Sequence, residues 1–166
     1  MFVAGWIPEP CELVDGEIVE KVPQSSDHIK AVRRTARCLR HLFGDERTFS
    51  QSPMALGVYD EPEPDIFISA LPDSAYPTGK PTPAETVLVV EISISTLDYD
   101  KGKKASRYAL AGVADYWVLD VADRKLLVYR NPTGGVYSAP QELSETDTVT
   151  PLAKPDAVIA VADLLP

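Results

Sequence analysis

Two acidic residues and one lysine stand where metal-dependent chemistry could take place. Glu91 lies within the stretch VLVVEISI, in which every near neighbour is apolar. An isolated carboxylate in such a buried strand is costly or stays protonated, so a cation, a metal ion or an open cleft must offset its burial. Asp65 begins the apolar run 66–68, and this position at the mouth of a strand suits a ligand. Lys104 follows Asp100 by one helical turn in a second charged stretch.

Simpler interpretations of Asp65 and Lys104 stay open. Asp65 also suits a loop aspartate that caps the start of a strand. Lys104 could pair only with Asp100, because an i,i+4 ion pair contributes a few tenths of a kcal/mol to a helix. Tyr108 lies another turn along and shares the face of Lys104. Helical spacing alone therefore assigns no catalytic role to this lysine.

Two carboxylates on neighbouring strands with a lysine nearby are typical of metal-dependent phosphodiester hydrolysis. Carboxylate oxygens hold hard divalent cations such as Mg²⁺, which also bridge to phosphate. The cation polarises the phosphodiester and lowers the pKa of an attacking water. A lysine can orient that water and stabilise the charge of the transition state. The generic form of this pattern, PD-(D/E)xK, is short, and a bare match to it is weak evidence.

The first half of the chain contains a predicted hairpin and a predicted helix. The stretch CELVDGEIVEKV predicts a β-hairpin about Asp15-Gly16, because an Asp-Gly pair suits the positive φ angles of a tight turn. Residues 28–43 carry apolar side chains at helical spacing, with capping residues at 25–27 and Gly44 at the end. The opposite face of this helix is basic and carries Lys30, Arg33, Arg34, Arg37 and His41.

The rest of the chain predicts an α/β sheet. Strands are expected over 48–52, 65–69 and 86–95, then a helix over 100–111 and a strand over 115–121. The strands on either side of the second helix form a βαβ unit and should therefore be parallel. Helices should cover the faces of the sheet. A hairpin of 125–130 with 136–139 is expected near the end, the proline-rich stretch 72–83 predicts a surface loop, and 157–165 is ambiguous.

Length, composition and charge limit the possible protein classes. The 166 residues, 45% of them hydrophobic, suit one globular domain over residues 1–166. No apolar run reaches the roughly 18 residues of a membrane span, and no secretion signal is visible, so a cytoplasmic protein without a membrane partner is expected. The two cysteines and two histidines show no zinc-ligand spacing.

The charge distribution bears on nucleic-acid binding in two opposite ways. A formal net charge of −9 argues against a general nucleic-acid binder. Yet ten of the sixteen lysines and arginines lie within residues 28–47 and 100–107. This clustering is consistent with a local cationic patch and equally with two solvated helix faces.

Longer stretches of the sequence resemble the Uma2 family of restriction-endonuclease-like proteins. The resemblance is carried by EPEPDIFI, VVEISISTLDYDKGKKASRYALAGVADYWVLD, CELVDGEIVE, SSDHIKAV and FSQSPMAL, over about residues 10–130. It implies a PD-(D/E)xK nuclease fold: an α/β restriction-endonuclease-like core of helix, three strands, helix and strand. An N-terminal β-hairpin and a C-terminal β-hairpin extension would complete this fold.

The resemblance also implies roles for single residues. Asp65 is similar to the family's Pro-Asp aspartate and Glu91 to the glutamate of the following strand. These two carboxylates and the main-chain carbonyl of Ile92 would then hold the metal. Ser93 stands where the generic motif has its lysine, and the family's lysine is matched by Lys104 on the next helix. The implied catalytic residues are therefore Asp65, Glu91 and Lys104.

Further positions match the family in supporting roles. The auxiliary residues would be Glu17, Gln51, Ser93, Asp100 and Tyr108. His28 resembles the family's helix-start histidine, for which capping or packing is expected rather than catalysis. Ile94 departs from the polar residue often seen there in the family.

The sequence thus predicts an endonuclease that hydrolyses DNA phosphodiester bonds with Mg²⁺ or Mn²⁺. The candidate DNA contacts are Lys30, Arg33, Arg34, Arg37 and Lys101, and a homodimer is expected for cutting both strands. A binding or regulatory module of the same fold without turnover is the alternative, favoured by the net charge of −9. A carboxylate-pair glycosidase is weaker, because the chain lacks the aromatic cleft residues expected there and Lys104 would have no role.

Overall fold

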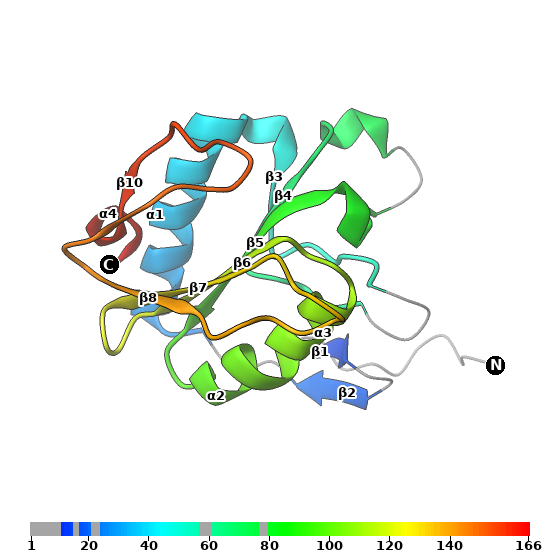
Figure 1. Ribbon diagram of the computed structural model, residues 1–166, viewed down its shortest axis with the longest axis horizontal. Coiled ribbons are helices and arrows are strands. Elements are labelled where there is room, and N and C mark those ends of the chain that lie inside the picture. The colour runs from blue at the N-terminus through cyan, green and yellow to red at the C-terminus, as the bar shows by residue number, and fades with distance from the viewer. Residues whose placement is uncertain (1–10, 15–16, 21–23, 57–60, 77–79) are drawn as a thin grey trace.

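The computed structural model describes residues 11–14, 17–20, 24–56, 61–76 and 80–166. At its centre is a mixed six-stranded sheet (Figure 1). The strands, in spatial order, are β3 (Thr48–Ser50), β4 (Ile66–Ser69), β5 (Thr86–Ser93), β6 (Asp115–Asp120), β7 (Lys125–Arg130) and β8 (Gln141–Ser144). Helix α1 (Ser26–Phe43) packs on one face, and a helical segment at 97–110 packs on the other. The predicted α/β class is confirmed.

The pairing of β5 with β6 confirms the predicted βαβ unit. These two strands are parallel, and the other neighbours in the six-stranded sheet pair antiparallel. Parallel neighbours cannot be joined by a tight turn, so the chain needs a long crossover between them. The helical segment at 97–110 provides this crossover.

Side chains of the central strands alternate between two hydrophobic clusters. Ile66 and Ile68 of β4 lie in the cluster with the buried face of α1. Phe67 and Val89 lie in the cluster on the opposite face. Because successive side chains of a strand point to opposite faces, Glu91 falls on the same face as Val89. The pleat of β5 therefore directs this carboxylate toward the crossover helix.

Helix α1 has the ends that its sequence predicts. Ser25 is the N-cap, and its hydroxyl accepts a hydrogen bond from the main-chain N–H of His28 at 3.2 Å. Gly44 follows the last turn with φ of +90°, a conformation that favours glycine. The buried face of the helix is formed by Ala31, Thr35, Ala36, Leu39 and Phe43.

The crossover segment is not a uniform α-helix. It begins as α2 (Leu97–Tyr99), continues as the π-helical turn η4 (Asp100–Lys104) and ends as α3 (Ala105–Leu110). A π-helical turn holds one residue more than an α-helical turn, and such turns are frequent at functional sites. Asp100 and Lys104, at the two ends of η4, are both buried. The π-helical turn therefore carries Asp100 and Lys104, two residues that the sequence predicts to belong to the site.

Shorter elements complete the described residues. Strands β1 (Cys11–Val14) and β2 (Glu17–Glu20) pair antiparallel as predicted, while their Asp15-Gly16 connection lies outside the described residues. The 3₁₀ turns are η1 (Asp45–Arg47), η2 (Asp73–Ala75) and η3 (Pro83–Glu85). The ambiguous stretch near the C-terminus forms β10 (Ile159–Ala160), which pairs with β9 (Thr148–Val149), and helix α4 (Val161–Leu164). None of the described helices is both long and apolar enough to cross a membrane.

The predicted C-terminal hairpin is wrong in its second strand. Strand β7 pairs with β6 on one side and with Gln141–Ser144 on the other, and residues 136–139 form no strand. Gly134 and Gly135 have φ of +60° and +77°, and only an isolated bridge joins Thr133 to Val136. Because a proline donates no hydrogen bond to a ladder, regular pairing with β7 starts only after Pro140.

Asp115 joins three parts of the C-terminal half. Its side chain is fully buried at the start of β6. Its carboxylate accepts hydrogen bonds from Trp117 Nε1 at 2.8 Å, from Arg130 Nε at 3.2 Å and from the main-chain N–H of Leu152 at 2.8 Å. Strands β6 and β7 and the segment after β9 therefore depend on one carboxylate.

Replacing Asp115 by alanine should lower the free energy of unfolding by about 3 kcal/mol, because buried donors lose their acceptor. Urea unfolding of both proteins measures this difference. The exposed Asp123→Ala variant is the matched control and should stay within about 0.5 kcal/mol of the wild type. A loss below about 1 kcal/mol for Asp115→Ala would contradict the account of this carboxylate.

Candidate active site

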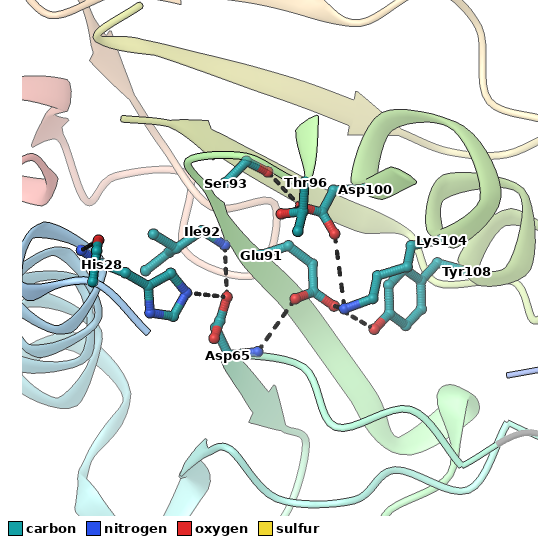
Figure 2. Close-up of polar contacts among 10 residues, drawn as sticks. His28, Asp65, Glu91, Ile92, Ser93, Thr96, Asp100, Lys104 and Tyr108 are labelled. Atoms are coloured by element: carbon teal, nitrogen blue, oxygen red, sulfur yellow. Dashed lines mark hydrogen bonds and ion pairs between the residues drawn. The ribbon is translucent and has the colours of Figure 1, made fainter. Parts of the chain in front are cut away.

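Asp65 and Glu91 lie opposite each other on neighbouring antiparallel strands. The register pairs Ile66 of β4 with Val90 of β5, so the residue before Ile66 falls opposite the residue after Val90. The main-chain N–H of Asp65 donates to Glu91 Oε2 at 3.4 Å (Figure 2). Asp65 and Glu91, which the sequence predicts as a pair of metal ligands, are therefore neighbours at the start of β4.

Glu91 is a buried carboxylate with a cation beside it. Its side chain is 2% exposed. Oε1 accepts a hydrogen bond from the Tyr108 hydroxyl at 2.8 Å and lies 3.1 Å from Lys104 Nζ. Oε2 lies on the side of Asp65. The cost of burying the Glu91 carboxylate among apolar residues is thus offset by an ion pair with Lys104 of the crossover segment.

Lys104 contacts two carboxylates rather than one. Its Nζ lies 3.8 Å from Asp100 Oδ1, one turn earlier on its own segment, and 3.1 Å from Glu91 Oε1 on the sheet. The pairing with Asp100 alone, which helical spacing suggested, is therefore incomplete. The shorter contact is the tertiary one, and it brings the predicted catalytic lysine to the predicted catalytic glutamate.

Asp100 is held by two hydroxyl groups, one from the last residue of β5 and one from the residue before α2. Ser93 Oγ donates to its Oδ2 at 2.5 Å and Thr96 Oγ1 donates to the same atom at 2.6 Å. Burial raises the pKa of Asp100 above its ordinary value, and Lys104 and the two hydroxyl groups oppose this shift. The main-chain carbonyl of Asp100 accepts a hydrogen bond from Tyr116 at 2.8 Å. These contacts fix the start of the π-helical turn that carries Lys104.

Asp65 is fixed by donors from two other elements. Its Oδ2 accepts from the main-chain N–H of Ile92 at 2.8 Å and lies 3.3 Å from His28 Nε2 of α1 (Figure 2). The hydrogen bond with Asp65 raises the pKa of His28, and partial burial opposes this shift. The expected capping hydrogen bond of His28 uses its main-chain N–H, whereas its ring reaches the candidate site. The sequence does not predict this contact: the family resemblance and the helix-start position of His28 indicate only capping or packing.

Two predicted auxiliary residues have no side-chain contact with the acidic pair among the described residues. The Glu17 carboxylate is 74% exposed and lies 3.3 Å from Lys103 Nζ. Gln51 follows β3 with an exposed side chain and a positive φ of +48°, and its main-chain N–H donates to the Asp65 carbonyl at 3.1 Å. Ser93, Asp100 and Tyr108 do belong to the network around Lys104 and Glu91.

The candidate DNA-binding residues are exposed, but several of them have partners. Lys30 pairs with Asp27 at 3.1 Å, and Lys101 pairs with Asp98 at 3.0 Å. Arg34 donates to the main-chain carbonyls of Asp163 and Ala162, at 3.2 and 3.4 Å, and so ties α1 to α4. The two remaining candidates, on the exposed face of α1, are Arg33 and Arg37.

The donor atoms at the site suit a hard divalent cation. Mg²⁺ is usually bound by one or two carboxylates, with waters and substrate phosphates completing its shell. Asp65 and Glu91 provide such a pair, and the Ile92 main chain adjoins Asp65 through its N–H. Within the described residues no group of three or more histidine, cysteine, aspartate or glutamate side chains could hold a metal ion. Asp65 and Glu91 are therefore the side chains of this site that could hold a cation.

Comparisons with known proteins identify the family of this chain and a similar fold. The model of the family Uma2, described as "Putative restriction endonuclease", matches residues 8–162. The chain belongs to the Uma2 family. One similar solved structure, described as a "putative nuclease belonging to DUF820" from Anabaena variabilis ATCC 29413, superposes with a TM-score of 0.71 at 18% identity. The match covers 93% of this chain and 88% of that one, and at this identity it shows a shared fold. None of the curated proteins searched matches this Uma2 chain.

Replacing Asp100 by asparagine should change how stability depends on pH. Because burial raises its pKa above the ordinary 3.8, ionisation of Asp100 opposes folding. This cost appears as pH rises above 3.8 and is complete above the folded-state pKa. The stability of Asp100→Asn relative to wild type should therefore increase as pH rises from about 3 to about 7. Urea unfolding at each pH measures the trend, and a flat or falling difference would contradict it.

Proposed function

We propose that this Uma2 chain is a metal-dependent endonuclease that hydrolyses phosphodiester bonds in DNA. The observation that carries the proposal is that the two oxygens of the Glu91 carboxylate face different neighbours. Oε1 faces Lys104 and Tyr108, at 3.1 and 2.8 Å, and Oε2 faces Asp65. One buried carboxylate thus links a candidate metal ligand to a candidate catalytic lysine.

The carboxylates of Asp65 and Glu91, with the main-chain carbonyl of Ile92, would hold Mg²⁺ or Mn²⁺. When bound, such an ion supplies charge neutralisation at the phosphate and lowers the pKa of a coordinated water. Tyr108 keeps the Glu91 side chain in one orientation through its hydrogen bond to Oε1. Ile92 and His28 do the same for Asp65 through Oδ2. Both ligands are therefore held before a cation arrives, which lowers the ordering cost of binding.

Lys104 would orient the attacking water and stabilise negative charge on the phosphate. Its ammonium group has three donors and lies between Glu91 and Asp100 in a site with few water contacts, since its side chain is 10% exposed. Electrostatic stabilisation is strong where water is excluded and the donor is already in place. The π-helical turn and the Asp100 contacts provide this placement.

DNA would approach along the exposed face of α1. The first turn of this helix reaches Asp65 through His28, and Arg33 and Arg37 lie further along its exposed side. Lys30, Arg34 and Lys101 would have to exchange their present partners for phosphate oxygens. With a net charge of −9, we expect weak and strongly salt-dependent binding. A homodimer would place two such sites on the two strands of a duplex.

A binding or regulatory module without turnover is the second candidate function. It is favoured by the ion pair between Lys104 and Glu91, which already neutralises the central carboxylate, and by the net charge of −9. Such a module could bind a divalent cation or nucleic acid without cleaving a bond. Cleavage and metal binding must therefore be measured separately.

Cleavage of supercoiled and single-stranded DNA should require Mg²⁺ or Mn²⁺ and should fall at least about 100-fold in Glu91→Gln and in Lys104→Ala. Gel assays with the full chain measure this loss. The exposed substitutions Glu46→Gln and Lys125→Ala match the two chemical changes and should keep wild-type activity. Cleavage that survives in Lys104→Ala would remove the proposed role of the lysine, and no cleavage by the wild type would favour the binding module.

Divalent cations should raise the Tm of the wild type by several degrees, because a ligand that binds only the folded state stabilises it. Asp65→Asn and Glu91→Gln should each abolish this rise, since each removes one carboxylate ligand. Thermal melts of each protein with and without Mg²⁺ or Mn²⁺ give the shift relative to the same variant, so a change in metal-free stability does not confuse the result. An equal rise in the variants would place any cation elsewhere.

A further inference from the structure

The side chain of His28 belongs to the site, although nothing in its sequence context assigned it a role there. Its ring comes from the first turn of α1, whereas the carboxylate that it touches precedes β4. We propose that His28 is a positioning residue that fixes the Asp65 carboxylate for cation binding. This inference rests on the metal-dependent function proposed above.

One oxygen of Asp65 receives both hydrogen bonds. Oδ2 accepts from the Ile92 N–H at 2.8 Å and from His28 Nε2 at 3.3 Å. The His28 and Asp65 side chains are 14% and 15% exposed, so water screens the contact only partly. Two donors from different elements fix the rotation of the carboxylate. Among the described residues Oδ1 accepts no hydrogen bond, which leaves this oxygen as the one for a cation.

His28 acts as a hydrogen-bond donor rather than as a ligand. Nδ1 is buried and has no hydrogen-bond partner in the described part of the chain. As a metal ligand through Nε2, a neutral ring would carry its hydrogen on Nδ1, where a buried donor without an acceptor costs about 1–3 kcal/mol. With the hydrogen on Nε2, Nδ1 is a buried acceptor without a donor among the described residues, but the ring gains the hydrogen bond to Asp65 Oδ2. The surroundings of the ring therefore favour donation.

The N-cap of α1 holds the ring in place. The main-chain N–H of His28 donates to the Ser25 hydroxyl, which fixes the backbone from which the ring projects. The helix itself is anchored to the sheet through Ala31 and Leu39, both fully buried. The orientation of Asp65 thus depends on the N-cap of α1 and on the packing of this helix against the core.

Two amide substitutions at position 28 separate donation from mere packing. The side-chain amide nitrogen of glutamine reaches about as far as Nε2 of histidine, whereas that of asparagine reaches only about as far as Nδ1. His28→Gln should therefore keep the donor to Asp65, and His28→Asn should lose it. Both variants retain the main-chain hydrogen bond to Ser25.

Titration calorimetry of Mn²⁺ into the full chain without DNA tests the proposal. We expect His28→Asn to weaken Mn²⁺ binding by about 10-fold or more, as is typical when a residue that orients a metal ligand is lost. His28→Gln should bind within about threefold of the wild type. Urea unfolding without metal is the parallel measurement, because a purely structural role would lower stability without changing the Kd.

The outcomes distinguish this inference from the proposed function. No Mn²⁺ binding by the wild type would overturn the proposed metal site and the role of His28 with it. Mn²⁺ binding that His28→Asn leaves unchanged would overturn only the role of His28. Equal losses in His28→Gln and His28→Asn would also overturn it, because the imidazole itself would then be required and would act as a ligand.

Discussion

The burial of Glu91 is the constraint on which the rest of the site depends. A carboxylate in the central strand of a covered sheet is tolerated only with a cation and hydrogen bonds around it. Lys104 and Tyr108 meet this need from the crossover helix, at 3.1 and 2.8 Å. The π-helical turn, the Ser93 and Thr96 hydroxyls and the Tyr116 hydroxyl all act on the segment that carries Lys104. Removing Lys104 would leave an uncompensated charge in the core.

The sequence predicts the parts of this site that local pattern determines. An acidic residue inside VLVVEISI marks Glu91, and capping and glycine signals mark the ends of α1. The parallel pairing of β5 and β6 follows from the strand–helix–strand order. Combined with the family resemblance, these signals predict that Asp65, Glu91 and Lys104 belong to one site.

Local sequence patterns do not predict contacts between segments that are distant in the chain. Helical spacing pairs Lys104 with Asp100, but the shorter contact is to Glu91, thirteen residues earlier on the sheet. His28 meets Asp65 only because α1 packs across the sheet with its first turn at the start of β4. The sequence predicts the wrong partner for β7, because the apolar Val136 lies in a surface loop, 66% exposed, and does not start a strand. Tertiary packing decides each of these cases.

Charge balance connects the buried ion pair with the proposed cation. Asp65, Glu91 and Asp100 carry three negative charges when all are ionised, and Lys104 offsets one of them. Burial is the largest cause of the raised pKa of Asp100. The negative charge of Asp65, which is part of this surplus, adds to the shift. The surplus of two charges is the amount that one divalent cation would balance. A cation beside Asp65 would therefore favour the ionised form of Asp100, whose Oδ1 lies 3.8 Å from the proposed catalytic lysine, Lys104.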